Sequence, residues 1–261
     1  RRARAGPPGG GGGGGGRWAR SAAAAPVVSM DLYNNRSSGC FAGECTVLMA
    51  DGRRRRLDAI ARGDLVWSPT ARGRGGGPGA AEVLCVVETP CAGGREYLAE
   101  LPGGLWATPY HPVRVGPEGT PGGGGGGDAP SWRYPHEVAP VRDRACPAVY
   151  DLVVAGGGSV VVNGVEAVTM GHGLDQPIAS ASASSLRTTA HPFFGTEKVK
   201  EALSTLPGWA QGHVKLGGVV RDSKTGLICG LTPASAMDLR GPRKAENCIN
   251  GANASVVPVP V

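Results

Sequence analysis

Short apolar runs, separated by turn signals, follow one another from about residue 46 to residue 169. They are rich in β-branched residues and are bounded by Gly, Pro and Asp-Gly pairs, which favours short strands joined by tight turns. The runs cover residues 46–49, 65–67, 82–89, 97–101, 105–108, 112–115, 149–154, 160–162 and 165–169. Because many short strands with regular turns are typical of all-β domains, the pattern predicts an all-β fold for this region.

A helical period appears only in the last quarter of the chain. Val199, Leu203 and Leu206 recur at spacings of four and three, which places them on one face of a helix. Thr196 is the expected N-cap, and a Pro-Gly pair follows the last apolar position. Beyond this helix, two apolar pairs flank a turn at residues 222–226 and predict a hairpin. We therefore expect a small C-terminal helix and hairpin extension on the β domain.

Glycine divides the chain into domains and linkers. Residues 1–29 are Gly-, Ala-, Pro- and Arg-rich and cannot bury enough apolar surface to offset their ordering entropy. Two more glycine runs, at 73–79 and 122–127, are expected to be insertions in surface loops. The predicted organisation is a disordered linker at 1–29, a β domain at 30–173, the extension at 174–232 and a loosely ordered tail at 233–261.

The net charge of +6 is concentrated in residues 1–20 and 53–56. We expect a solvated tail and a solvated hairpin loop there. Binding of nucleic acid would want aromatic residues among the basic ones, and only Trp18 lies near the first cluster, so no nucleic-acid partner is expected. No stretch approaches the roughly 18 uninterrupted apolar residues of a membrane-spanning helix. We therefore expect a soluble chain with no transmembrane segment.

Seven cysteines are scattered along the chain without a Cys-x-x-Cys pair. This spacing argues against a zinc ribbon and gives no support to a disulfide framework. Free thiols in a reducing compartment fit better, which favours a cytoplasmic location. Cys45, Cys85 and Cys229 are expected to be buried core thiols. No cofactor and no metal site is predicted.

Three segments carry candidate chemistry. The first holds Gly39 and Cys40 before an Asp-Gly turn and a Gly-Asp-Leu-Val strand. The second runs from Thr108 to His111, with Pro-Tyr between them. The third has Asp151 in a Val-Tyr-Asp-Leu strand and continues to an Asn-Gly turn. The order and spacing of all three along one β-rich chain make them informative together.

Cys40 can attack the peptide bond that precedes it, because its thiol lies next to the carbonyl carbon of Gly39. This attack is an N-to-S acyl shift that gives a thioester, and the small Gly39 lets the peptide bend. The thiol must lose a proton and the leaving nitrogen must gain one. His111 is the candidate acid at that nitrogen, Thr108 is a candidate to hold the same peptide, and Asp151 is a candidate to orient or deprotonate the thiol.

The three segments resemble the Hint domain, the self-processing module of hedgehog proteins and inteins, over about residues 39–172. Further on, the run His191-Pro-Phe-Phe-Gly-Thr and the Gly-His-Val at His213 are similar to the Vint subfamily, found downstream of von Willebrand type A domains. The resemblance implies a flattened horseshoe of bent strands. It also implies catalytic roles for Cys40, Thr108, His111 and Asp151. We expect His191 and His213 to be packed or hydrogen-bonded rather than metal ligands.

The activity implied by the resemblance is autocatalytic, cysteine-dependent cleavage rather than turnover. The substrate would be the chain's own upstream segment, a von Willebrand type A region, and the acceptor nucleophile stays open among water, a sterol, an amine and a thiol. Inteins end in His-Asn, whereas the corresponding place here reads His172-Gly173, so complete splicing is not expected. The alternative is a catalytically silent Hint-fold binding or assembly module. It would be favoured by a structure with His111 and Asp151 far from Cys40, or by one that buries the Gly39–Cys40 bond in a rigid strand.

Overall fold

The computed structural model describes residues 39–71, 79–116, 129–179, 187–235 and 246–248. All of them belong to one compact unit that spans Asn35–Val261. The predicted linker at 1–29 and the predicted loop insertion at 122–127 lie outside the described residues, as do most of the insertion at 73–79 and most of the tail at 233–261.

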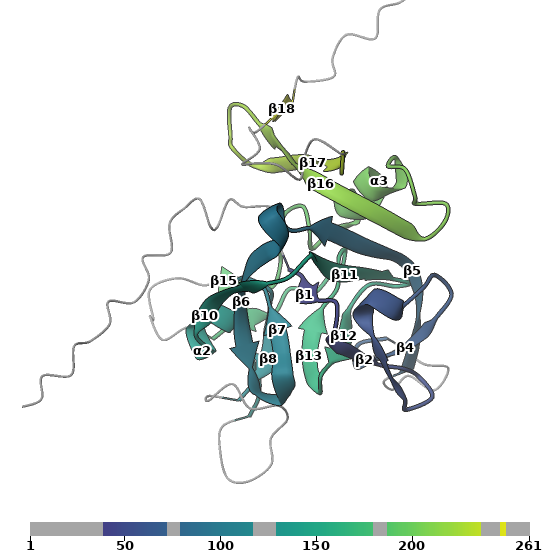
Figure 1. The fold of residues 1–261 in the computed structure, drawn as a ribbon, viewed down its shortest axis with the longest axis vertical. Coiled ribbons are helices and arrows are strands. Elements are labelled where there is room, and N and C mark those ends of the chain that lie inside the picture. The colour runs from purple at the N-terminus through teal and green to yellow at the C-terminus, as the bar shows by residue number, and fades with distance from the viewer. Residues whose placement is uncertain (1–38, 72–78, 117–128, 180–186, 236–245, 249–261) are drawn as a thin grey trace, which may run out of the picture. The chain divides into compact units, whose positions relative to one another are not determined.

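Ten strands form the larger of two sheets (Figure 1). They are β1 (Phe41–Ala42), β4 (Leu65–Ser68), β5 (Gly79–Pro90), β6 (Arg95–Leu101), β7 (Leu105–Ala107), β10 (Val141–Ala145), β11 (Ala148–Val154), β16 (His213–Asp222), β17 (Ile228–Pro233) and β18 (Glu246–Cys248). Their order is β10-β6-β7-β1-β11-β5-β16-β17, with β4 on β5 and β18 on β16. The long strand β5 pairs antiparallel with β11 and parallel with β16.

Eight strands form the second sheet. They are β2 (Thr46–Leu48), β3 (Arg54–Arg56), β8 (Val113–Val115), β9 (Ser131–Arg133), β12 (Ser159–Val162), β13 (Val165–Val168), β14 (Pro177–Ile178) and β15 (Arg187–Thr188). Their order is β15-β14-β9-β8-β13-β12-β2-β3. The chain passes from the first sheet to the second between β1 and β2, between β7 and β8, and between β11 and β12.

The prediction of an all-β fold is confirmed, since each apolar run of the sequence forms a strand. Within the described residues, helix is confined to α2 (Pro135–Val138), α3 (Glu197–Ser204) and single 3-10 turns at Leu57–Ala59, Ala92–Gly94 and Pro102–Gly104. The pattern did not predict the short strands β1, β3, β9, β10, β14 and β15. These are too short or too polar to show an apolar alternation, and their pairing comes from neighbours distant in sequence.

The extension has the helix and the hairpin that the sequence predicts. Val199 and Leu203 of α3 are buried against Val214 and Leu216 of β16, so the apolar face of the helix covers this strand. Thr196 occupies the N-cap position, but its hydroxyl donates to the carbonyl of Phe193 instead of capping the helix. Because β16 also pairs with β5, the hairpin continues the first sheet. A strand in the tail, β18, was not expected.

The cysteines divide into buried thiols and one bonded sulfur. Cys45 and Cys85 are buried free thiols, as expected. The prediction for Cys229 is wrong, because this residue is exposed on β17 and disulfide-bonded. β17 is the last strand in the order of the first sheet. The cytoplasmic location stays a prediction.

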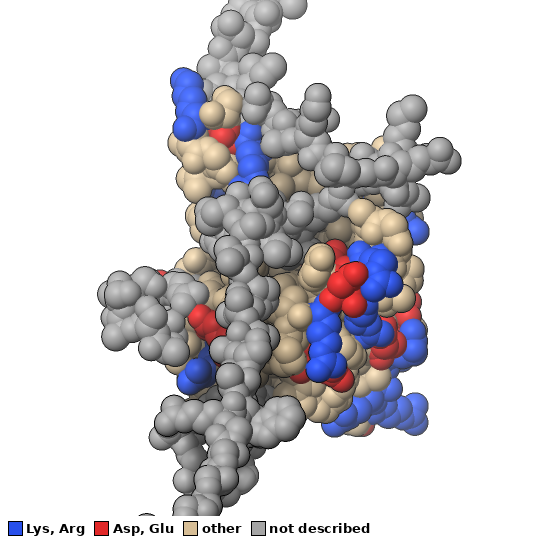
Figure 2. Space-filling model, turned by 60° about the vertical axis from the view of Figure 1, so that its left-hand side comes forward, with Lys and Arg blue, Asp and Glu red and all other residues tan. Residues whose placement is uncertain are grey.

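The charged residues of the described surface are largely paired. On the face drawn in Figure 2, Lys and Arg side chains lie beside Asp and Glu side chains rather than in a patch of one sign. The arginine run expected in a hairpin loop instead forms the edge strand β3, whose residues are all exposed. Arg55 and Arg56 make ion pairs with Asp64 and Asp58. Across the described residues, no helix has the length and apolar character needed to cross a membrane.

Candidate functional site

Cys40 lies immediately before β1, at the point where this strand enters the first sheet. β1 pairs with β11 so that Phe41 is opposite Tyr150. One residue further along this antiparallel register, Cys40 comes opposite Asp151. Directly opposed residues of an antiparallel pair point to the same face of the sheet. The register therefore brings together two predicted site residues that are far apart in sequence.

Gly39 has a backbone conformation that other residues rarely adopt. Its φ is +77°, in the left-handed region. A Cβ atom on Gly39 would also lie 2.8 Å from Nδ1 of His111, which is closer than real Cβ contacts. Glycine is thus required here for two reasons, its freedom at positive φ and its lack of a side chain. The bond between Gly39 and Cys40 is held tightly against the His111 ring.

Thr108 and His111 are brought together by a β-turn between β7 and β8. Pro109 occupies the second position of this turn, which its fixed φ favours, and the His111 N–H donates to the Thr108 carbonyl at 3.2 Å. Thr108 in turn contacts Cys40 through two hydrogen bonds. The Cys40 N–H donates to Thr108 Oγ1 at 3.0 Å, and the Thr108 N–H donates to the Cys40 carbonyl at 2.9 Å. The nitrogen of the Gly39–Cys40 bond is thereby fixed by a side-chain oxygen.

His111 is fully buried and packs on Phe41, with ring centroids 4.2 Å apart. Its Nε2 lies 2.9 Å from the carbonyl oxygen of Val168 and donates to it. Burial lowers the pKa of His111 to about 4, although the Val168 carbonyl acts in the opposite direction. The ring is therefore neutral near pH 7, with the unprotonated Nδ1 facing Gly39. Nδ1 has no hydrogen-bond partner of ordinary geometry among the described residues.

Asp151 and Cys40 are two buried acids whose charges oppose one another. Burial raises the pKa of Asp151 well above its ordinary value, although the N–H of Leu152 donates to its carboxylate at 2.6 Å. Burial also raises the pKa of the Cys40 thiol, and the nearby Asp151 raises it further. Both groups therefore favour their neutral forms, and two negative charges at once are disfavoured. An ionised Asp151 at this position would be a base for the thiol proton.

The structure brings all the predicted site residues together. Gly39, Cys40, Thr108, His111 and Asp151 are buried, and each contacts or faces Cys40 or the bond before it. The site residues are therefore not far from Cys40, and the Gly39–Cys40 bond is buried but precedes β1 rather than lying within a strand. The group offers a nucleophile, a base and a proton relay, which together suit acyl transfer.

Sequence reasoning missed one further member, Thr89 at the end of β5. Its side chain is buried, and it is the only group among the causes acting on Cys40 that lowers the pKa of that thiol. The one signal in the sequence is a Thr where the apolar alternation of Cys85 and Val87 would continue. We call Cys40, Thr89, Thr108, His111 and Asp151 the Cys40 centre.

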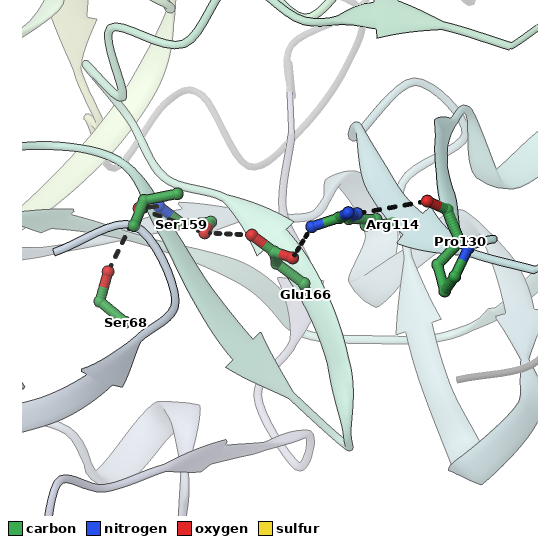
Figure 3. Close-up of polar contacts among 6 residues, drawn as sticks. Ser68, Arg114, Pro130, Ser159 and Glu166 are labelled. Carbon is green, nitrogen blue, oxygen red and sulfur yellow. Dashed lines mark hydrogen bonds and ion pairs between the residues drawn. The ribbon is translucent and has the colours of Figure 1, made fainter. Parts of the chain in front are cut away.

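A second group of polar side chains lies between β4 and β13, as Figure 3 shows. Ser68 and Ser159 are buried, whereas Thr70 and Arg114 are exposed. The Ser159 hydroxyl donates to Glu166 at 2.6 Å, and Arg114 donates to the other oxygen of Glu166 at 3.2 Å. Ser68 and Thr70 extend this chain of hydrogen bonds from Ser159. We call these five residues the Glu166 network. It joins strands of both sheets and contains no group near Cys40.

The histidines of the extension are hydrogen-bonded, as expected. His191 Nδ1 accepts from the N–H groups of Phe193 and Phe194, and His213 Nε2 lies 2.9 Å from the carboxylate of Glu88. His172 is buried, and its Nδ1 accepts from a backbone N–H at 2.9 Å. Within the described part of the chain, no three His, Cys, Asp or Glu side chains are grouped so as to hold a metal ion.

Comparison with protein families gives one match. The model of the family Vint, described as a Hint domain, matches residues 39–230. The match begins at Gly39 and includes both sheets and the extension. A comparison with curated proteins gives no match.

Solved structures with similarity to this chain include inteins. The DnaB intein from Synechocystis sp. PCC 6803 is 15% identical, with a TM-score of 0.33, and the match covers 51% of this chain and 99% of that one. The gp41-1 intein is 16% identical, with a TM-score of 0.34, and the match covers 51% and 100%. The mini-intein variant M86 of Ssp DnaB is 17% identical, with a TM-score of 0.34, and the match covers 52% and 97%. At TM-scores below 0.5 these likenesses carry no argument about activity.

Proposed function

This chain belongs to the Vint family of Hint domains, a self-processing module, and we propose that it cleaves the Gly39–Cys40 bond through an N-to-S acyl shift. One observation carries the proposal: the nitrogen of this bond donates to Thr108 Oγ1 while Gly39 is held at positive φ against His111. A buried backbone N–H needs a partner in any chain, and here the partner is a side chain three residues before the candidate acid. Glycine adopts this φ without strain, so the close approach of Gly39 to the His111 ring is the informative part of its conformation.

In the proposed reaction, the Cys40 thiol gives its proton to the Asp151 carboxylate. The sulfur then attacks the carbonyl carbon of Gly39, and a bond from sulfur to carbon forms. The bond from that carbon to the Cys40 nitrogen breaks, and the nitrogen takes up a proton. The shift is an isomerisation, since the proton lost by sulfur equals the proton gained by nitrogen.

His111 supplies the proton at the nitrogen in this proposal. Its Nδ1 lies on the side of Gly39 and is unprotonated near neutral pH, since its pKa is about 4. The ring must therefore gain a proton at Nδ1 before it gives one to the nitrogen. A histidine of low pKa is a strong acid once protonated, which favours rapid transfer to an amine. Its fixed Nε2 contact with Val168 keeps Nδ1 directed at the bond.

The driving force of the reaction is placement, because a peptide bond is otherwise inert. A well-oriented intramolecular nucleophile reaches effective molarities of about 10⁵–10⁸ M. Cys40 is joined covalently to its target and is fully buried with it. The thioester then passes the upstream segment to an acceptor nucleophile, for which water, an amine and a thiol are the candidates.

The test is mass spectrometry of the chain with its native upstream residues, incubated with hydroxylamine or dithiothreitol. We expect a fragment that ends at Gly39, and its amount should rise with hydroxylamine, which attacks thioesters. Cys40→Ala should abolish this fragment. Cys45→Ala, another buried free cysteine close in sequence, should leave it unchanged. A folded chain that yields no such fragment would contradict the proposal.

The second candidate function is a Hint-fold binding or assembly module that does not cleave. Its support is the burial of Gly39 and Cys40, because hydrolysis of a thioester needs water at this carbonyl. In that case the wild type and Cys40→Ala would both stay uncleaved, and their interactions would be the same. The hydroxylamine experiment therefore separates the two candidates.

A further inference from the structure

Thr89 is a buried polar residue with an unsatisfied hydroxyl. It lies near the end of β5, and its side chain is 3% exposed. Its Oγ1 has no hydrogen-bond partner of ordinary geometry among the described residues. Buried hydroxyls nearly always have a partner, and an exception requires an explanation. A Val at this position would be equal in shape and would avoid the loss of hydration.

The pairing of three strands places Thr89 on the same face of the sheet as the nucleophile. Val149 of β11 pairs with Ala42 on one side and with Thr89 on the other. Cys40 and Asp151 lie two residues further along their strands, so all of these side chains belong to one face of the sheet. On this face, Thr89 is the side chain whose hydrogen bonding lowers the pKa of the Cys40 thiol.

We propose that Thr89 is a further catalytic residue, whose hydroxyl donates a hydrogen bond to the Cys40 sulfur as it becomes a thiolate. The inference deepens the proposed function and rests on it. The unsatisfied oxygen is explained, because its partner in the reaction is the charged sulfur rather than the neutral thiol. A β-branched Thr in a strand has few side-chain rotamers, so the donor is held in place at little entropic cost.

The Cys40 thiolate needs such a donor because its surroundings oppose the charge. Burial and Asp151 both raise the pKa of Cys40, whereas Thr89 lowers it. Thr108 Oγ1 is already occupied by the Cys40 N–H, and His111 faces Gly39. Thr89 is therefore the donor left for the sulfur among the members of the Cys40 centre.

The expected size of the effect follows from the strength of hydrogen bonds to charged groups. Such a bond favours the thiolate roughly 10- to 100-fold. A thiolate of lower pKa is also a weaker nucleophile, since the logarithm of its rate constant falls by about 0.4–0.5 for each unit by which the pKa falls. About half of the logarithmic gain in thiolate population therefore remains as a gain in the cleavage rate. We expect removal of the hydroxyl to slow cleavage roughly 3- to 10-fold near neutral pH.

The experiment measures the rate of hydroxylamine-dependent cleavage against pH in the full chain, together with the unfolding midpoint. Thr89→Val should slow cleavage near neutral pH, and the deficit should narrow as the pH rises and the thiolate forms without help. Its unfolding midpoint should not fall, since no hydrogen bond is lost. Thr89→Ser keeps the hydroxyl and should restore the wild-type pH profile.

Thr189→Val is the matched control. Thr189 is equally buried, but its hydroxyl donates to the Leu174 carbonyl and accepts from the Gln176 N–H. This variant should lose stability and keep the wild-type cleavage rate per folded molecule. The two Thr→Val changes therefore have opposite expected outcomes.

Equal rates for wild type and Thr89→Val at every pH would overturn the role of Thr89 and leave the acyl shift intact. Equal slowing of Thr89→Val across the whole pH range would also overturn it, because a merely structural role does not depend on thiol ionisation. A wild-type chain that never cleaves would refute the proposed function itself. The two failures are distinguishable, because the first concerns Thr89→Val relative to a wild type that cleaves and the second concerns the wild type alone.

Discussion

The Cys40 centre and the Glu166 network are both groups of polar side chains, and they differ in burial and in how completely their hydrogen bonds are made. Every member of the Cys40 centre is buried, whereas Thr70 and Arg114 of the Glu166 network are exposed. In the Glu166 network, Ser159 and Arg114 satisfy both oxygens of the carboxylate (Figure 3). In the Cys40 centre, Thr89 Oγ1 and His111 Nδ1 have no partner of ordinary geometry within the described residues. Among the described residues, two further buried side-chain atoms have no hydrogen-bond partner, and they belong to the guanidinium groups of Arg133 and Arg144, which are members of neither group.

This difference separates groups that hold the fold from groups that are prepared for a reaction. A satisfied network stabilises one arrangement and has no polar atom left for a substrate. An unsatisfied donor or acceptor costs stability and is retained where it meets charge or protons that appear only during chemistry. Thr89 and His111 both adjoin Cys40 or the bond before it. We therefore expect substitutions in the two groups to affect different quantities.

The largest expected effect is that of His111→Gln on the cleavage rate. Gln keeps much of the volume of the buried ring but cannot relay a proton. General acid catalysis contributes about 10²- to 10⁴-fold, so cleavage should slow by this factor. The measurement is the rate of appearance of the fragment that ends at Gly39. A slowing of less than tenfold in a folded chain would remove His111 from the proton relay.

Asp151→Asn should raise stability at neutral pH while it slows cleavage. Below the ordinary pKa of a carboxyl group, Asp151 is protonated in both the folded and the unfolded chain and has no effect. As the pH rises, the unfolded chain releases this proton at a lower pH than the folded chain does, because burial raises the pKa of Asp151, so the wild type loses stability. Asn avoids this loss.

Thermal unfolding of wild type and Asp151→Asn across a pH series checks this prediction. The two midpoints should coincide at acidic pH and should separate in favour of Asn as the pH increases. If the wild type is the more stable chain at neutral pH, Asp151 is a structural carboxylate and belongs with groups like Glu166.

Glu166→Gln tests the other side of the comparison. The variant weakens the acceptor of the Ser159 hydroxyl and removes the ion pair with Arg114, so we expect a loss of about 1–2 kcal/mol in the free energy of unfolding. The cleavage rate per folded molecule should stay at the wild-type value. Denaturant unfolding and the fragment assay together measure both quantities. A large loss of cleavage without a loss of stability would erase the distinction between the two groups.

Among the substitutions in the Cys40 centre, Thr108→Val should have the smallest effect on cleavage. It removes the oxygen that accepts from the Cys40 N–H, a neutral hydrogen bond of about 0.5–1.5 kcal/mol, which corresponds to roughly 2- to 10-fold in rate. The backbone contact from the Thr108 N–H to the Cys40 carbonyl stays in place. If Thr108→Val and His111→Gln slow cleavage equally, strain in the peptide matters more than proton transfer.

The sequence was sufficient for most of the fold because apolar runs and turn residues are local signals. The strands from β2 to β13 that carry apolar runs follow this pattern, as do α3 and the hairpin after it. The strand β3 was missed, because three exposed arginines give no alternation and form a strand only through pairing with β2. The disulfide at Cys229 was missed for the same reason, since a bonded partner is not a local property.

In the Cys40 centre, the sequence predicted the residues that motifs contain but not the one that pairing supplies. Thr108 and His111 share one turn, and Cys40 follows Gly39 directly. Thr89 enters the centre only through the register of β5 on β11 and of β11 on β1, which no spacing in the sequence reveals. The protonation of His111 likewise depends on burial and on the carbonyl of Val168 in the other sheet.

The most direct test of the central claim is the N-terminal residue of the folded protein after expression with its native upstream residues and treatment with hydroxylamine. If the Cys40 centre is a reactive site, N-terminal sequencing will find a chain that begins at Cys40, and Cys40→Ala will not produce it. A folded wild-type chain that remains continuous across Gly39 and Cys40 would contradict the account.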